Sequence, residues 1–222
     1  MNRVQKNILL ETVAVLLAAL GLTALVLRWR TGLVLRYSEI IIAAIWLYLP
    51  LCIILARKVS LAELSLEKLR PGKSLRWFGI STAVVLPSFY LATFLGAVKL
   101  LHYGFRLEKP ELFWSLFFGQ LLVVSLPEEW FFRGYLQGRL NQLFARNWNL
   151  LSAKIGPSLF LSAALFALAH LALKPSLDRV LVFFPALVFG WLREKTDSLL
   201  APILFHFLAN LSFIIFQASL LK

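Results

Sequence analysis

The chain has 222 residues, of which 60% are hydrophobic, and its 23 Lys and Arg against 11 Asp and Glu give a net charge of +12. A soluble domain is only about 45–50% apolar, so this composition predicts an integral membrane protein. The positive charge lies mainly in short segments between apolar runs, where anionic headgroups favour it, and the pattern of a nucleic-acid-binding protein is absent. A single cysteine, Cys52, excludes an intrachain disulfide.

Seven apolar segments predict an all-α fold, a polytopic membrane helix bundle of about seven to eight transmembrane helices. The segments are residues 8–27, 40–56, 77–98, 112–126, 157–173, 180–192 and 199–221. The first is long enough to span and is followed by basic residues, so we expect a retained helix rather than a signal peptide. The fifth and sixth are short for a full crossing, which favours an embedded turn at residues 174–179.

The connectors carry two further signals. Residues 60–70 have leucines on one helical face and charged side chains on another, which predicts an amphipathic helix at the membrane interface. A solvated connector is the alternative for this stretch. If the segments simply alternate, the loops on the side of the N-terminus hold more Lys and Arg than the opposite loops, which favours a cytoplasmic N-terminus.

Ionisable side chains inside apolar segments are costly to bury and are functional candidates by default. Most of the acidic residues, Glu194 among them, lie in or beside connectors, and Glu11 lies near the start of the first segment. Glu128 and Glu129 stand out because they directly follow a strongly apolar run. Pro127 is expected to end the preceding helix and to begin the next one, with both acids in its first turn.

Arg133 follows Glu129 by four residues, so the two side chains can pair on one face of a helix. Glu128 points about 100° away and is then free for acid–base chemistry. The alternative for the two acids is a capped helix start at the membrane surface.

Two histidines complete the set of candidates. His170 closes an apolar run, where a packing role competes with a catalytic one. His206 and Asn210 are one turn apart in the last apolar segment. Their side chains can both bond a neighbouring helix, or both point at one small polar ligand.

Together these residues resemble the motifs of the CPBP family (CAAX protease and bacteriocin-processing, or Abi), which includes the type II CAAX prenyl protease. Glu-Glu-x-x-x-Arg occurs as Glu128, Glu129 and Arg133; Phe-x-x-x-His occurs as Phe166 and His170; His-x-x-x-Asn occurs as His206 and Asn210. One short motif recurs by chance, but three complete motifs in the family's order are specific. The resemblance covers about residues 112–220.

The resemblance implies a metal-independent glutamate-type intramembrane protease of the EC 3.4 class, acting on a membrane-associated or lipid-anchored peptide. By motif, Glu128 would activate a water with the help of His170, and His206 and Asn210 would stabilise the oxyanion. We expect one membrane domain over residues 1–222. Within it, residues 1–110 would supply accessory N-terminal helices and residues 111–222 the catalytic core with its three motifs.

The same resemblance gives Glu129, Arg133 and Phe166 supporting roles and implies neither a cofactor nor a metal. A zinc protease on the same carboxylate and histidines is one alternative, because two imidazoles and a carboxylate form a known ligand set. A non-catalytic immunity or scaffold protein and a Glu/His proton-relay transporter are the others. The expected partners are the lipid bilayer and a membrane-embedded or lipid-anchored peptide, without nucleic acid, in a prokaryotic cytoplasmic membrane.

Overall fold

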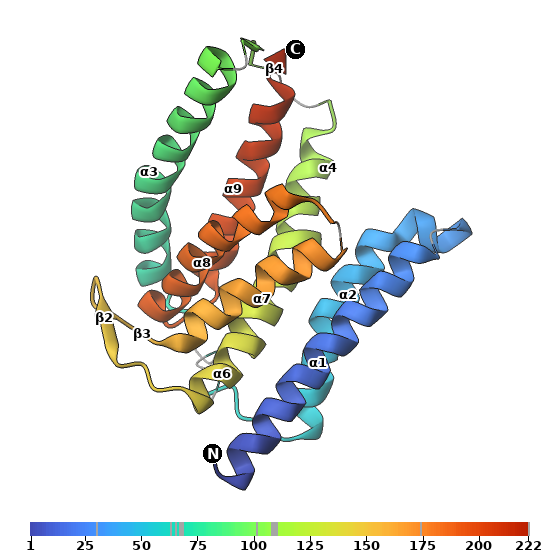
Figure 1. Ribbon diagram of the computed structural model, residues 1–222, viewed down its shortest axis with the longest axis vertical. Helices are drawn as coiled ribbons and strands as arrows, with labels where there is room; N and C mark the ends of the chain where they lie inside the picture. Colours follow the sequence, from blue (N-terminus) through green and yellow to red (C-terminus); the bar gives the residue numbers. More distant parts are fainter. Residues whose placement is uncertain are drawn as a thin grey trace.

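The computed structural model describes residues 1–29, 31–62, 64, 66, 69–100, 102–107, 111–173 and 175–221. It is 79% helical, and the continuous helical runs in these ranges form seven helices (Figure 1). The strands make two short antiparallel ribbons, in which β1 (Gly104–Phe105) pairs with β4 (Leu220–Leu221) and β2 (Trp148–Leu150) pairs with β3 (Ala153–Ile155). The all-α expectation is confirmed.

Four helical runs are long and apolar enough to cross a membrane. They are α1 (Arg3–Arg28), α2 (Gly32–Ala56), α3 (Pro71–Leu95) with its π-helical extension η1 (Gly96–Leu100), and α9 (Leu200–Ala218). Large apolar side chains on their outer faces, such as Leu17, Tyr48 and Leu91, are about 60% exposed, as lipid contact requires. The protein is an integral membrane protein, with fewer clear spans in the described residues than the seven to eight expected.

The stretch of residues 60–70 differs from its prediction. Its described residues form turns and irregular chain rather than an amphipathic helix, while residues 63, 65, 67 and 68 lie outside the described residues. Leu64 is fully buried against Gly138, and its carbonyl accepts a 2.6 Å hydrogen bond from Nη2 of Arg193. This leucine therefore packs into the protein core instead of lying on the membrane surface.

The helix that carries the two acids does not break at Pro127. Residues 113–143 run without interruption through α4 (Phe113–Phe118), η2 (Gly119–Ser125), α5 (Leu126–Glu129), η3 (Trp130–Leu136) and α6 (Gln137–Leu143). A proline lacks the N–H of the helical ladder and crowds the carbonyl four residues earlier. The wider π-helical turns of η2 directly precede it and accommodate both defects. The predicted helix break at Pro127 is therefore wrong, as is the alternative of a capped helix start, and both acids lie midway along a long helix.

The two short apolar segments form an inclined hairpin. It consists of α7 (Pro157–Leu173), the 3₁₀-helix η4 (Leu177–Val182) and α8 (Phe183–Thr196). In Figure 1 this pair lies across the middle of the molecule, and α7 ends well short of the upper ends of α3 and α9. A side chain near the end of α7 therefore reaches the level at which the long helix carries its acids.

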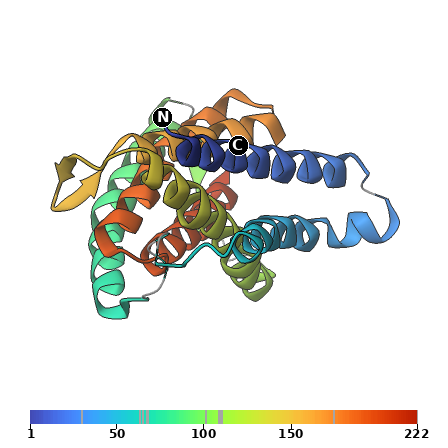
Figure 2. The ribbon, with the colours of Figure 1, turned by 90° about the horizontal axis from the view of Figure 1, so that it is seen from below.

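Aromatic packing fixes the middle of that long helix. Trp46 of α2 packs against Phe131 and Phe132 of η3, with ring centroids 4.6 and 5.2 Å apart. In the other half of the bundle, Phe189 of α8 packs against Phe205 of α9. Figure 2 shows the α1–α2 hairpin flanking the remaining helices on one side. Because η3 packs against α2 and directly follows the two acids in the chain, the acids lie near the junction of the two parts.

Candidate active site

A fully buried ion pair forms the base of the site. Arg133 donates from Nη1 to Oε1 of Glu129 at 3.0 Å, and both side chains have no exposed surface. Nη2 donates to the carbonyl of Ala186 at 3.1 Å, and the guanidinium carbon lies 4.5 Å from the ring of Phe166 and 5.0 Å from that of Phe189. These contacts offset part of the cost of burying two charges.

The second acid of the motif also orients a histidine. Nδ1 of His206 lies 2.8 Å from Oε1 of Glu129. Because Oε1 of Glu129 also accepts the hydrogen bond from Arg133, Nδ1 of His206 is the donor in this contact and carries the proton. The imidazole stacks on Phe189 with centroids 4.6 Å apart. Its Nε2 atom is thereby turned toward Glu128, 3.9 Å from Oε2.

The other histidine is held in the same way from a different helix. Nδ1 of His170 lies 2.9 Å from the backbone carbonyl of Phe166, which only accepts, so this Nδ1 also carries a proton. The ring packs on Phe166 with centroids 4.3 Å apart. Nε2 of His170 again lies 3.9 Å from Oε2 of Glu128.

Glu128 stands at the meeting point of the two imidazoles. Its side chain is 23% exposed, but Oε2 is buried and has no hydrogen-bond partner among the described residues. Separations of 3.9 Å are too long for direct hydrogen bonds and suit a bridging water. With neutral rings, the carboxylate and both Nε2 atoms are all acceptors, so this group can take protons from one small donor.

Asn210 lies beside this group rather than in it. Its Nδ2 donates to Oε1 of Gln120 in η2 at 3.2 Å, which leaves one N–H of the amide for another acceptor. Sequence analysis missed Gln120. The signal that could have found it is a lone amide inside the apolar run of residues 112–126.

One known family matches the part of the chain that carries the three motifs. The family model described as type II CAAX prenyl endopeptidase Rce1-like matches residues 110–212, a range that contains all seven motif residues. Because residues 110–212 match this model, we refer to this range as the Rce1-like domain. This domain indicates a CAAX-type intramembrane protease and confirms the resemblance at the level of the family. Neither a curated protein nor a solved structure matches the chain.

The Rce1-like domain draws six of its seven motif residues into one cluster, with Asn210 at its edge. They come from α5, η3, α7 and α9, which only tertiary packing brings together. In the described part of the chain, no group of three or more His, Cys, Asp and Glu side chains is arranged to hold a metal ion.

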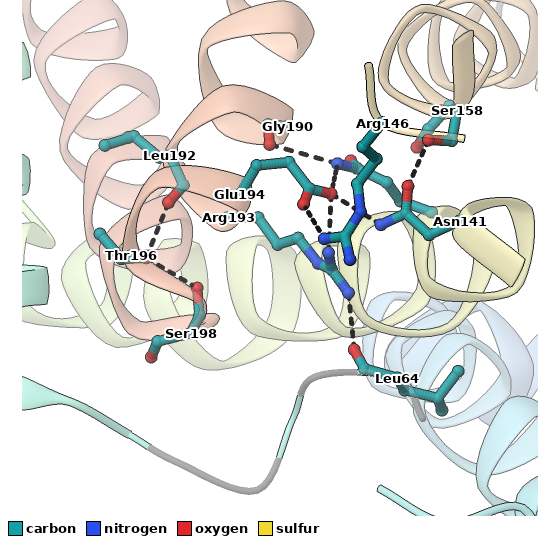
Figure 3. Close-up of polar contacts among 12 residues, drawn as sticks. Leu64, Asn141, Arg146, Ser158, Gly190, Leu192, Arg193, Glu194, Thr196 and Ser198 are labelled. Carbon is teal, nitrogen blue, oxygen red and sulfur yellow. Dashed lines mark hydrogen bonds and ion pairs between the residues drawn. The ribbon is translucent and has the colours of Figure 1, made fainter. Parts of the chain in front are cut away.

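A second buried carboxylate lies in the same domain, at the end of α8. Oε1 of Glu194 accepts hydrogen bonds from Gln137 (2.7 Å), Asn141 (2.8 Å) and Arg193 (2.7 Å), and Oε2 accepts one from Arg146 (2.8 Å) (Figure 3). Burial acts to raise the pKa of Glu194, but the charge of Arg193 and the other donors outweigh it and hold the pKa below its usual value. Although its sequence position suggests a connector, this side chain is only 2% exposed.

Proposed function

We propose that the Rce1-like domain is an intramembrane endopeptidase with Glu128 as its general base, acting on a membrane-associated or lipid-anchored peptide. The observation that carries this proposal is the convergence of Oε2 of Glu128 with Nε2 of His170 and Nε2 of His206, each 3.9 Å away. Both Nδ1 protons are already engaged, so Glu128 and Nε2 of His170 are free to accept protons from a water, while Nε2 of His206 can carry a proton and donate it. Hydrolysis by an activated water needs such a group of acceptors.

The proposed reaction begins with one proton on Nε2 of His206, stabilised by the Glu129 carboxylate at Nδ1. A water held by Glu128 and His170 attacks the scissile carbonyl carbon and gives its proton to Glu128. The resulting oxyanion accepts hydrogen bonds from Nε2–H of His206 and from the remaining N–H of Asn210. The C–N bond then breaks as Glu128 returns the proton to the leaving amine, so each turnover consumes one water.

Three motif residues act through others in this scheme. Glu129 is a positioning residue, because its carboxylate orients the ring of His206 and balances its positive charge. Arg133 pairs with the Glu129 carboxylate and holds it in place. Phe166 covers the guanidinium with its ring and fixes the tautomer of His170 with its carbonyl.

The proposal includes a multi-pass topology in a prokaryotic cytoplasmic membrane, in which all seven helical runs enter the bilayer and the α7–α8 hairpin turns within it. The N-terminus, the end of α2 and the end of α6 lie at one end of the molecule (Figure 1). That end carries Arg3, Lys6, Arg57, Lys58 and Arg146. Because Lys and Arg are enriched on the cytoplasmic side of membrane proteins, we assign this end to the cytoplasm.

Cleavage by the purified protein in nanodiscs tests this function. The substrates are prenylated, acylated and unmodified hydrophobic peptides, and wild type is compared with Glu128→Gln and with Glu39→Gln, an exposed glutamate of α2. We expect Glu128→Gln to lower turnover by about 10²–10⁴-fold, the usual contribution of a general base, and Glu39→Gln to leave it unchanged.

Two results would contradict the proposal. Turnover that a chelator abolishes and zinc restores would assign the reaction to a metal on the same residues. Full function of Glu128→Gln in cells, together with no cleavage by wild type, would assign the protein a non-catalytic role.

A further inference from the structure

A cavity of about 810 Å³ lies away from the active site, between the first half of α1, the end of α2 and α6. Its apolar wall includes Ile8 and Ile53. Its polar lining consists of Asn7, Glu11, Arg57, Lys58, Arg139 and Gln142. The function proposed above uses none of these side chains.

The charges in this lining do not balance. Glu11 is the one acid among the lining residues, and Arg57, Lys58 and Arg139 supply three positive charges. Oε1 of Glu11 accepts hydrogen bonds from Arg139 and, at 3.1 Å, from the hydroxyl of Tyr135, while Oε2 lies 3.4 Å from Nε of Arg57. One carboxylate is thus shared by two arginines, and two positive charges remain in excess.

The lining also offers more hydrogen-bond donors than it satisfies. Oε1 of Gln142 accepts from Nη1 of Arg139 at 3.2 Å, which fixes the orientation of the amide. Nε2 of Gln142 is then buried and has no partner in the described part of the chain. Arg139 itself is only 5% exposed, so it is part of the wall and not a solvated surface charge. A ligand that complements this wall is an anion with several acceptor oxygens.

The position of the cavity indicates what the rest of that ligand is. Glu11 and Ile8 belong to α1, whose length and composition fit a membrane span, and Arg57 and Lys58 lie where α2 ends. A polar pocket with an apolar wall at this level faces the region of lipid headgroups. We propose that the cavity binds the phosphate of an anionic phospholipid, with Arg57, Lys58 and Arg139 around the phosphate and a chain along the apolar wall.

The occupied site would join the accessory helices to the catalytic helix. Arg139 lies eleven residues after Glu128 on the continuous helix of residues 113–143, about 16 Å along its axis at 1.5 Å per residue. A bound headgroup would bridge this helix to α2 through Arg57. We therefore expect the lipid to raise thermal stability without taking part in the reaction.

Lipid titration of the delipidated protein in detergent tests the site, with native mass spectrometry and thermal unfolding as readouts. The ligands are phosphatidylglycerol, phosphatidylcholine and inorganic phosphate. We expect saturable binding of one phosphatidylglycerol with a rise in Tm, and neither effect with phosphatidylcholine. The double variant Arg57→Gln/Lys58→Gln removes two positive charges and should weaken this binding by about 30-fold.

The matched control is Lys73→Gln/Arg76→Gln, which removes the same charge from exposed positions on α3 and should bind like wild type. Equal weakening in both double variants would mean diffuse surface attraction and would overturn the site. Equal binding of the two lipids would also overturn it. Inorganic phosphate that binds as tightly as phosphatidylglycerol and displaces it would overturn the lipid assignment in favour of free phosphate.

Discussion

The Rce1-like domain holds two buried carboxylate centres that differ in one respect. At the end of α8, Glu194 has donors on both oxygens, four in all (Figure 3). In the middle of the bundle, Oε1 of Glu129 has two partners, while Oε2 of Glu129 and Oε2 of Glu128 have none within the described ranges. Each centre contains a buried arginine, so burial and charge pairing do not distinguish them. The two centres differ instead in their unsatisfied acceptor oxygens, which mark the centre that can take a proton.

The hydrogen-bond partners of each carboxylate indicate its role. The partners of Glu194 come from α6, from the segment that follows it and from α8, so their bonds fasten two helices together. The partners of Glu129 are one arginine and one imidazole, and the imidazole presents its second nitrogen to Glu128. Both oxygens of Glu194 therefore accept hydrogen bonds, whereas Oε2 of Glu128 keeps lone pairs that can accept a proton.

Replacing the glutamate of each centre by glutamine gives the largest expected difference between the two centres. Glu128→Gln should keep the fold and lose about 10²–10⁴-fold in turnover, because a neutral amide is not a base. Glu194→Gln should keep turnover per folded molecule and lose about 1–3 kcal/mol of stability, because an NH₂ group replaces an acceptor among donors. Turnover normalised to folded protein, with thermal unfolding in nanodiscs, measures both. Loss of turnover in well-folded Glu194→Gln would contradict this division of roles.

Removing the arginine of the active centre is expected to destabilise the folded protein as well as to abolish activity. Arg133→Met leaves Glu129 buried without its counter-ion, which should destabilise the protein by about 3–5 kcal/mol. The double variant Glu129→Met/Arg133→Met buries no charge and should be more stable than the single variant. It should still be inactive, since His206 has lost the carboxylate that orients it. Thermal unfolding compares the two variants, and equal instability would show that the cost is not one of unpaired charge.

Local patterns in the sequence predicted much of this architecture. The apolar run of residues 157–173 coincides with α7, because hydrophobic length is a property of neighbouring residues. The four-residue spacing of Glu129 and Arg133 likewise predicted their ion pair. The shortness of the fifth and sixth segments indicated the inclined hairpin that brings His170 to Glu128.

Features that depend on distant contacts were not predicted. The helix continues through Pro127 because π-helical turns precede it and Trp46 of α2 packs against the turns that follow. Glu194 is buried by Gln137 and Asn141, which are 57 and 53 residues away in the chain. No local pattern reports such partners, so the position of Glu194 after an apolar segment was mistaken for a connector.

A smaller difference between the two centres is expected in the pH dependence of stability. The pKa of Glu194 is lower in the folded protein than its usual value of 4.5, chiefly because Arg193 and the neighbouring donors outweigh burial. The folded state therefore binds this proton less tightly than the unfolded state. The stabilisation is present above the usual pKa and is lost as the pH falls through the lower folded pKa. Tm measured on the acid side should fall less steeply for Glu194→Gln than for Glu39→Gln, and parallel curves would contradict this.

The smallest expected effect concerns the amide at the edge of the active centre. Gln120→Leu removes the acceptor that orients Asn210. A neutral hydrogen bond is worth about 1 kcal/mol net, so kcat should fall by about fivefold to tenfold with KM unchanged. Gln120→Glu keeps an acceptor oxygen and should retain more of kcat than Gln120→Leu, while Gln217→Leu, an exposed glutamine on α9, should match wild type. A rise in KM with unchanged kcat would instead mean that Gln120 contacts the substrate, because a residue acting only through the oxyanion donor affects the transition state and not the bound ground state.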